Sequence, residues 1–223
     1  VNLQYNIIIM QSYVPKDIIT AVTDKVKAYI LRETLLPPNG RLQLAVSGGV
    51  DSVVLTDIMQ RLAPELGLNL CMAHLHHCLR GEYAERDEAF TRRFAEDRNI
   101  PIITEKIDIL RIARAYKQNV EETAREKRLF FLLISAYNQN CDYTATAHHM
   151  QDNAESMLLN LARGAGLDGL EGIVPKRENL YGGVFIRPLL CLTRPQIEAY
   201  AQAADLAHVH DHTNDDTDLK RNH

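Results

Sequence analysis

Hydrophobic residues along this chain follow two alternating spacings. Short apolar runs bounded by turn residues are followed by longer segments in which apolar residues recur every three to four positions. The first pattern is typical of buried strands and the second of amphipathic helices. Together they predict strands in residues 42–46, 68–75, 100–107, 141–147 and 184–190, and helices in residues 15–35, 53–59, 83–97, 121–137, 152–162 and 194–203.

This alternation of strand and helix predicts an α/β fold built on one doubly wound sheet. Such sheets are mostly parallel and carry helices on both faces. Their ligands sit at the carboxyl ends of the strands. Functional residues are therefore expected in the segments that directly follow each strand.

The strand in residues 42–46 runs into a turn with two glycines and two serines, residues 47–52 (SGGVDS). A sharp bend alone needs only one glycine. Backbone N–H groups and hydroxyls at the start of a helix favour an anion, so the turn predicts a phosphate site. It lacks both the Gly-Lys-Ser/Thr ending of the Walker loop and the three spaced glycines of the dinucleotide fingerprint.

Composition excludes several classes of protein. The 223 residues, 46% of them hydrophobic, suffice for one sizeable core. The apolar runs are shorter than the roughly 20 residues of a membrane span and no signal architecture opens the chain, so we expect a cytoplasmic protein without a membrane partner. The net charge of -4 argues against a basic nucleic-acid surface over the whole chain. The four cysteines are isolated in sequence, which favours reduced thiols.

Three histidines close together end the second predicted strand. His74 and His76 fall on one face of that strand, and His77 follows. Imidazole is a common metal ligand, and the tail segment HVHDH offers more of them. No zinc-like spacing links the two groups, so we favour histidines that face the core or a ribose. Arg80, just beyond, suits an anion-facing loop.

Two acids lie near the start of the helix that follows the fourth strand. Asp152 and Glu155 are three positions apart and share a face. Two carboxylates beside a triphosphate can hold Mg²⁺, which prefers oxygen ligands. Acids in a first turn can also merely complement the helix dipole. The nearby glycine turn favours the magnesium interpretation.

Two arginines share a face of the helix in residues 121–137. Arg125 and Arg128 are three positions apart, and on the same helix Val120 and Phe130 are expected to face the core. Most such arginines form surface ion pairs of little energetic consequence. Since the planar guanidinium also suits a phosphate or a buried carboxylate, both interpretations stay open.

Residues 47–52 resemble, without a departure, the loop of the ATP pyrophosphatase (PP-loop) family. Members bind ATP, release pyrophosphate and leave AMP on a substrate oxygen. The resemblance implies a fold of the adenine nucleotide alpha hydrolase-like, PP-loop type.

A longer series of motifs is similar to that of the tRNA(Ile)-lysidine synthetase family. In order, the motifs are SGGVDS, HLHHCLRGE, EETAREKR, HHMQDNAES with LARGAGLDGL, IRPLL and DHTNDDTDLKRN, and they span residues 42–222. These enzymes use ATP to adenylate C2 of the wobble cytidine of tRNA(Ile) with a CAU anticodon, and free lysine then displaces AMP to form lysidine. The resemblance implies a ligase with ATP and Mg²⁺ as cofactors and with tRNA(Ile) and L-lysine as partners. A homodimer is a candidate assembly.

The same resemblance implies the residues of the site. The implied catalytic residues are Asp51, Arg80, Arg125, Asp152 and Glu155. The implied nucleotide-binding residues are Ser47, Gly48, Gly49, Val50, Asp51, Ser52, His77 and His149. Asp51 and Asp152 would contact Mg²⁺, Asp51 is also a candidate for the attacking amine, and Arg163 occupies a further motif position.

The chain departs from the family pattern at a few positions. Gln151 stands where these enzymes usually have an aspartate, which predicts weaker binding of magnesium or lysine, and His212 and Thr213 replace the usual proline and serine. We divide the chain into an N-terminal extension (1–15), a PP-loop catalytic domain (16–215) and the start of a linker to missing C-terminal tRNA-binding domains (216–223). On that basis we expect the chain to bind ATP and to fail on tRNA.

Two other functions stay open. Another PP-loop enzyme, a tRNA thiolase or an amidating synthetase, would share the loop, although a thiolase of the related cytidine type would be expected to carry paired cysteines. A non-catalytic module that binds a nucleotide or tRNA is the other class. The intact acids Asp51, Asp152 and Glu155 argue against such a module.

Overall fold

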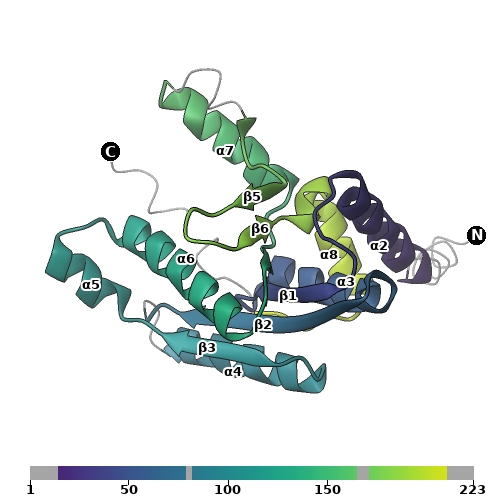
Figure 1. Ribbon diagram of the computed structural model, residues 1–223, viewed down its shortest axis with the longest axis horizontal. Coiled ribbons are helices and arrows are strands. Elements are labelled where there is room, and N and C mark those ends of the chain that lie inside the picture. Colours follow the sequence, from purple (N-terminus) through teal and green to yellow (C-terminus); the bar gives the residue numbers. More distant parts are fainter. Residues whose placement is uncertain (1–14, 79–81, 165–170, 210–223) are drawn as a thin grey trace, which may run out of the picture.

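The computed structural model describes residues 15–78, 82–164 and 171–209. In these residues six strands form a single sheet with helices packed against it (Figure 1). The strands are β1 (Gly40–Ala45), β2 (Leu68–His76), β3 (Ile102–Lys106), β4 (Tyr143–Ala145), β5 (Lys176–Glu178) and β6 (Val184–Ile186). The helices are α2 (Pro15–Arg32), α3 (Val50–Leu66), α4 (Glu82–Asp97), α5 (Ile109–Tyr116), α6 (Val120–Asn138), α7 (Met150–Ala162), the short 3-10 helix η2 (Pro188–Cys191) and α8 (Arg194–Ala203).

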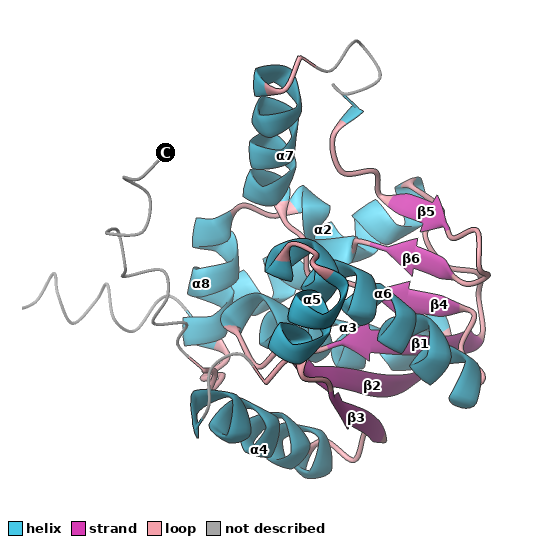
Figure 2. Ribbon diagram, turned by 90° about the vertical axis from the view of Figure 1, so that its left-hand side faces the viewer, coloured by secondary structure: helices cyan, strands magenta, loops and turns pink. Residues whose placement is uncertain are grey.

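The strand order is β3-β2-β1-β4-β6-β5 (Figure 2). All neighbouring strands run parallel except β5, which pairs antiparallel with β6. The chain first moves outward from β1 to β3 and then returns to place β4 on the other side of β1. The carboxyl ends of β1 and β4 therefore flank the topological switch point, where sheets of this kind bind ligands. The predicted doubly wound, mostly parallel α/β sheet is confirmed.

Strand β1 shows why both faces of the sheet are covered. Leu42 and Leu44 are fully buried in the main core together with residues of α3. Because successive side chains of a strand point to opposite faces, Gln43 and Ala45 face the other way, where Ala45 packs with Phe131 of α6. Helices α2 and α8 pack against α3 and complete the first face.

A buried glutamine joins the central strands to α6. Gln43 donates through Nε2 to the carbonyl of Leu132 (2.8 Å) and to Oγ1 of Thr144 (3.1 Å). Its Oε1 accepts from Oγ of Ser135 (2.8 Å) and Nε2 of Gln139 (3.1 Å). Since every hydrogen-bonding position of this buried amide is used, the network holds α6 in one place on the sheet.

The last part of the sheet differs from the prediction. The strand expected in residues 184–190 ends at Ile186, because Pro188 cannot donate to a sheet and begins η2 instead. Residues 176–178, expected in a turn-rich connection, form the antiparallel edge strand β5.

Two predictions about helices were incomplete or wrong. Helix α5 was not predicted, and its local signal is Asp108, whose side chain accepts a hydrogen bond from the N–H of Arg111 (2.9 Å). Val120 and Phe130 of α6 are 37% and 38% exposed rather than core-facing, whereas Phe131 and Leu132 are buried. The buried face of α6 lies beside the predicted one because the sheet contacts, rather than the helical period alone, set its rotation.

No helix in the described part of the chain has the length and apolar character needed to cross a membrane.

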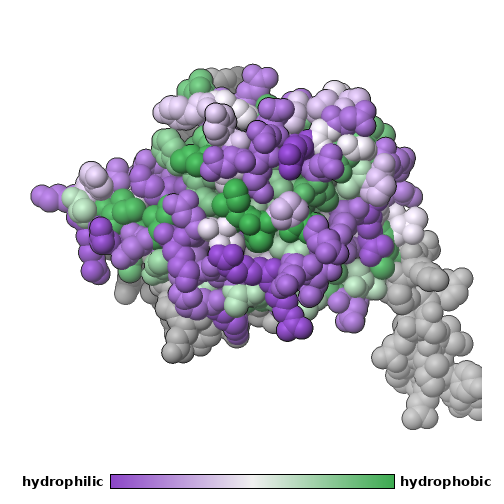
Figure 3. Space-filling view, turned by 60° about the horizontal axis from the view of Figure 1, so that its bottom comes forward, coloured by the Kyte–Doolittle hydropathy of each residue, from purple (hydrophilic) through white to green (hydrophobic). Residues whose placement is uncertain are grey.

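Figure 3 shows a face on which hydrophilic residues surround a central group of hydrophobic ones.

Candidate functional site

The turn between β1 and α3 holds several backbone N–H groups close together. Gly48 has a φ of +93°, which favours glycine, and Gly49 is the extended N-cap residue of α3, with no side-chain cap. Oγ of Ser52 accepts from the N–H groups of Ser47 and Gly48, both at 3.2 Å, and donates to the carbonyl of Gly49 at 2.9 Å. The loop is therefore held in shape by its own hydroxyl while the start of α3 keeps donors for an anion.

The first turns of three helices meet beside this loop. Asp51 in the first turn of α3 contacts Arg194, the first residue of α8, and lies 3.9 Å from Nε2 of His149, the N-cap residue of α7. The N–H of Met150 donates to the carbonyl of Leu192 at 3.0 Å and so joins α7 to the segment before α8. Each helix N-terminus carries a partial positive charge. Three of them at the switch point suit an anion of several charges.

The imidazole of His149 lies between two carboxylates. Its Nε2 is 3.9 Å from Oδ1 of Asp51 and its Nδ1 is 3.7 Å from Oδ2 of Asp152. Asp152 also accepts a hydrogen bond from the N–H of His149 at 2.8 Å, which fixes that carboxylate at the start of α7. Burial raises the pKa of the Asp51 carboxyl, while Arg194 and His149 act to lower it. Two carboxylates held this close to a phosphate loop fit Mg²⁺, which prefers oxygen ligands.

A cavity of about 250 Å³ opens next to the loop. It lies at the carboxyl ends of β1 and β2, between the first turns of α4 and one side of α6. The apolar part of its lining is Ala45, Val46, Ala73, Leu75, Ala84, Phe131 and Leu132, and the polar part is Ser47, His74, His76, His77, Asp87 and Arg128. An apolar cavity with a few polar groups, joined to a phosphate loop through Ser47, has the character of a nucleoside pocket.

Arg128 rather than Arg125 lines this cavity. Arg125, one turn earlier on α6, does not line it, although both arginines are exposed. The wall of the cavity packs protein atoms around the Arg128 guanidinium, and this partial desolvation lowers the pKa of Arg128. The side chain still reaches solvent through the opening of the cavity. Among the described residues no carboxylate offsets that effect. Arg128 is therefore a cation available to an anionic ligand.

His148 lies at the end of β4 near two arginines. Its Nδ1 is 2.9 Å from Oγ1 of Thr146. Burial, together with the positive charges of Arg128 and Arg187, lowers the pKa of His148 to about 4. His148 is therefore neutral at pH 7, and the positive charge at this end of the sheet comes from the two guanidinium groups.

Of the histidines expected to face the core or a ribose, His74 and His76 of β2 are buried. Nδ1 of His74 is 2.8 Å from the carbonyl of Val46, and burial lowers the pKa of His74. His77 is half-buried in the wall of the cavity.

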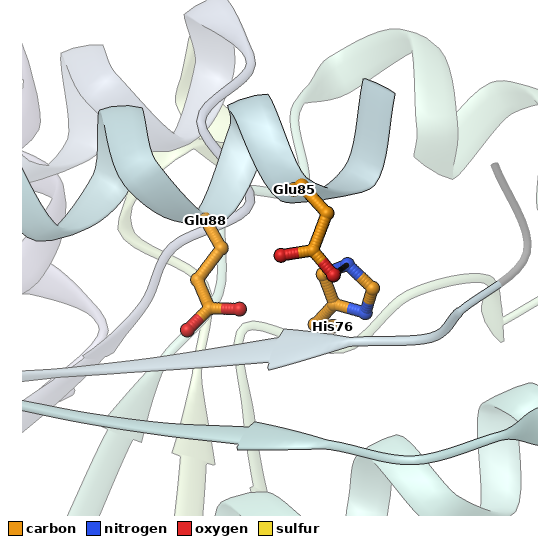
Figure 4. Close-up of side chains that lie close together, drawn as sticks. All are labelled: His76, Glu85 and Glu88. Atoms are coloured by element: carbon orange, nitrogen blue, oxygen red, sulfur yellow. Dashed lines mark ion pairs between the residues drawn. The ribbon is translucent and has the colours of Figure 1, made fainter. Parts of the chain in front are cut away.

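His76 lies close to two acids of α4, Glu85 and Glu88, within the distances of a metal site (Figure 4). Nζ of Lys106 already lies 2.6 Å from Glu85 and 3.2 Å from Glu88, where a cation would bind. Nδ1 of His76 accepts from the N–H of Cys78 at 3.2 Å, so its Nε2 carries the proton and faces Glu85 at 3.7 Å. The group is an ion-pair network that ties α4 to β2 and β3.

The structure brings together only part of the residue set expected from the sequence. Residues 47–52, His149 and Asp152 form one connected site, and His77 lines the adjoining cavity. Glu155 is exposed on α7, Arg163 is exposed directly after it, and Arg125 is exposed on α6. Arg80 lies outside the described residues, as do His212 and Thr213.

Sequence reasoning missed Arg194 as a site residue. The overlooked signal is the charge itself, since an arginine at the first position of a helix lies at the wrong end of the helix dipole. Periodicity places Arg125 and Arg128 on the same face of α6 and could not decide which of the two lines the cavity.

The fold and the site define an α/β nucleotide-binding protein whose phosphate loop lies at the switch point of a parallel sheet. The model of the PP-loop domain matches residues 20–223. The chain belongs to the PP-loop domain family.

Several curated relatives are similar to this chain over most of its length. The tRNA(Ile)-lysidine synthase of Dehalococcoides mccartyi is 36% identical over 205 residues, which cover 90% of this chain and 44% of the relative. The enzyme of the same name from Geobacter sulfurreducens is 38% identical over 204 residues, which cover 92% of this chain and 42% of the relative. The chain thus spans less than half the length of these relatives.

Solved structures share the fold at low sequence identity. The U34-tRNA thiolase NcsA from Methanococcus maripaludis, solved with its [4Fe-4S] cluster, superposes with a TM-score of 0.73 at 19% identity, covering 86% of this chain and 65% of the thiolase. The NH3-dependent NAD synthetase from Campylobacter jejuni gives a TM-score of 0.51 at 18% identity, covering 86% of this chain and 73% of the synthetase. These similarities support the fold alone.

Proposed function

We propose that this chain is the ATP-binding, adenylating part of a tRNA(Ile)-lysidine synthase. The observation that carries the proposal is the convergence of three helix N-termini on the SGGVDS loop beside Asp51 and Asp152. The family match supports ATP as the nucleotide, and the relatives named tRNA(Ile)-lysidine synthase support wobble modification as the reaction.

In this proposal the adenosine part of ATP occupies the cavity and the triphosphate extends to the loop. The N–H groups at the start of α3 stabilise the departing pyrophosphate, which gains charge as AMP is transferred to the carbonyl oxygen at C2 of the cytidine. Asp51 and Asp152 would hold Mg²⁺, which would neutralise part of that charge when bound. Arg128 contributes a fixed positive charge on the nucleoside side.

The second step requires an amine and a polynucleotide. The carboxylates of Asp152 and Glu155 on α7 are candidates to attract the ammonium groups of L-lysine. The exposed guanidinium of Arg125 is available to the phosphates of tRNA(Ile) with its CAU anticodon. Three further points stay predictions. They are the binding of tRNA by other domains, the homodimer and the cytoplasmic location.

The test measures release of AMP and pyrophosphate from ATP with Mg²⁺, L-lysine and transcribed tRNAs. It is carried out on this chain alone and on this chain joined to the C-terminal region of the Geobacter sulfurreducens relative, because the chain covers only 42% of that protein. We expect ATP binding by both proteins and lysine-dependent AMP formation by the joined protein, with the CAU-anticodon tRNA(Ile) alone.

Other outcomes would identify other functions. Turnover that needs a sulfur donor would indicate a thiolase, and turnover that needs ammonia but no tRNA would indicate an amidating synthetase. ATP binding without turnover on any partner would favour a nucleotide-binding module.

A further inference from the structure

Arg194 is fixed at the start of α8 and reaches back toward the phosphate loop. Its backbone N–H donates to Oε1 of Gln151 at 2.9 Å. Its Nη1 lies 3.1 and 3.0 Å from the two carboxylate oxygens of Asp51, and its Nε donates to Glu198 at 2.7 Å. The guanidinium thus bridges the first turn of α8 and the first turn of α3.

The position of this arginine is unfavourable for stability alone. A cation in the first turn of a helix opposes the positive end of the helix dipole, and here two further helix starts lie nearby. The Arg194 and Asp51 side chains are also 36% and 30% exposed, so their ion pair contributes little to folding. An arginine at such a place points to a role in binding an anion.

Space for a ligand adjoins the guanidinium. A cavity of about 430 Å³ is lined by Val50, Arg194, Glu198 and residues from the end of α8 onward. Val50 is the first residue of α3, so the cavity and the free donors of the phosphate loop border each other. A planar guanidinium with several N–H groups matches the oxygens of a phosphate in a paired geometry.

We propose that Arg194 binds the terminal phosphates of ATP and that Asp51 holds it ready in the free site. On binding, the guanidinium passes from the carboxylate of Asp51 to phosphate oxygens, and the released carboxylate would be available to hold a cation. No covalent bond forms or breaks in this exchange, which replaces one anionic partner of the arginine by another. The inference rests on the proposed function, because it assumes that the loop binds a triphosphate.

The test compares the affinities of ATP, with and without Mg²⁺, and of AMP for the chain by isothermal titration calorimetry. Arg194→Gln should weaken the affinity for ATP about 10- to 100-fold, as expected for loss of a charged hydrogen bond. The affinity for AMP should change less than about twofold. Arg194→Lys should recover part of the ATP affinity, because the charge remains but the paired geometry is lost. A structural role alone would weaken both nucleotides together.

A matched control lies on the same helix as Asp51. Arg61 donates to Asp57 at 2.7 Å, an arginine-aspartate pair two to three turns further along α3. Arg61→Gln should leave both affinities unchanged, and thermal unfolding of each variant checks that it is folded. Equal ATP affinity of Arg194→Gln and wild type, or an equal loss for ATP and AMP, would overturn the role of Arg194. If the wild-type chain binds ATP no better than AMP, the proposed triphosphate site itself is wrong.

Discussion

Oε1 of Gln151 accepts a hydrogen bond from the backbone N–H of Arg194 at 2.9 Å. The side chain at this position therefore caps the start of α8 instead of turning toward the carboxylates of Asp51 and Asp152. A carboxylate could accept the same hydrogen bond, and its charge would complement the helix dipole.

For this reason Gln151→Glu should have little effect on ATP binding. We expect ATP affinity with Mg²⁺ within about twofold of wild type and an unfolding free energy equal or higher by about 0.5 kcal/mol. Calorimetry and urea unfolding measure the two quantities. A tenfold gain in affinity with Mg²⁺ would instead support the expectation that the amide weakens magnesium binding.

Asp51→Asn should separate catalysis from folding. The amide keeps the shape of the side chain but cannot supply the charge that a cation needs, so we expect adenylation by the joined protein to fall by at least about 100-fold. The unfolding free energy should change by no more than about 1 kcal/mol, because the ion pair with Arg194 is partly exposed. Pyrophosphate release and urea unfolding measure these effects, and a fully active variant would remove Asp51 from the mechanism.

Gly48→Ala should strain the loop. Gly48 has a φ of +93°, and an added Cβ would lie 3.4 Å from both Oγ1 of Thr91 and Cγ2 of Val209. We expect a loss of about 1–3 kcal/mol in unfolding free energy, with weaker ATP binding. Gly49→Ala is the control, since its φ is -70° and the nearest atom would be Oγ of Ser47 at 3.6 Å. Equal effects of both changes in urea unfolding would contradict the assigned loop geometry.

His148 should make the protein less stable in acid. Burial and the charges of Arg128 and Arg187 lower the pKa of His148 to about 4 from its ordinary 6.5, so the unfolded state takes up a proton at a higher pH than the folded state. The resulting stability is complete above pH 6.5 and is lost as the pH falls toward 4. The unfolding free energy of His148→Gln minus that of wild type should be about 2–3 kcal/mol higher at pH 4.5 than at pH 7. Urea unfolding at both pH values tests this, and a pH-independent difference would contradict it.

Gln43→Leu should destabilise the fold, because the side chain of Gln43 joins the central strands to α6. The leucine removes four hydrogen bonds and leaves the carbonyl of Leu132 and the hydroxyl of Ser135 with fewer partners in the interior. We expect a loss of about 2–4 kcal/mol in unfolding free energy. Gln139→Leu should cost less than half as much, because Gln43 keeps its other three bonds. A thermal melt of both variants gives the comparison.

The sequence by itself was sufficient for the strands and helices around the phosphate loop. Residues 40–66 combine a buried run, two glycines and a helical period within a short stretch, and the structure has β1, the turn and α3 there. Strand and helix periods and the conformational freedom of glycine are local properties, so local pattern predicts them. Weak or short signals, such as those of α5 and β5, were missed because few residues carry them.

Tertiary structure alone decided which side chains meet. Arg194 and Asp51 are 143 residues apart, and their contact exists because α8 packs on α3 beside the switch point of the sheet. Arg128 rather than Arg125 lines the cavity because of the rotation of α6. That rotation is set by the burial of Leu132 and by the hydrogen bond from the amide of Gln43. Such contacts follow from the packing of elements far apart in sequence, and no pattern within one element contains that information.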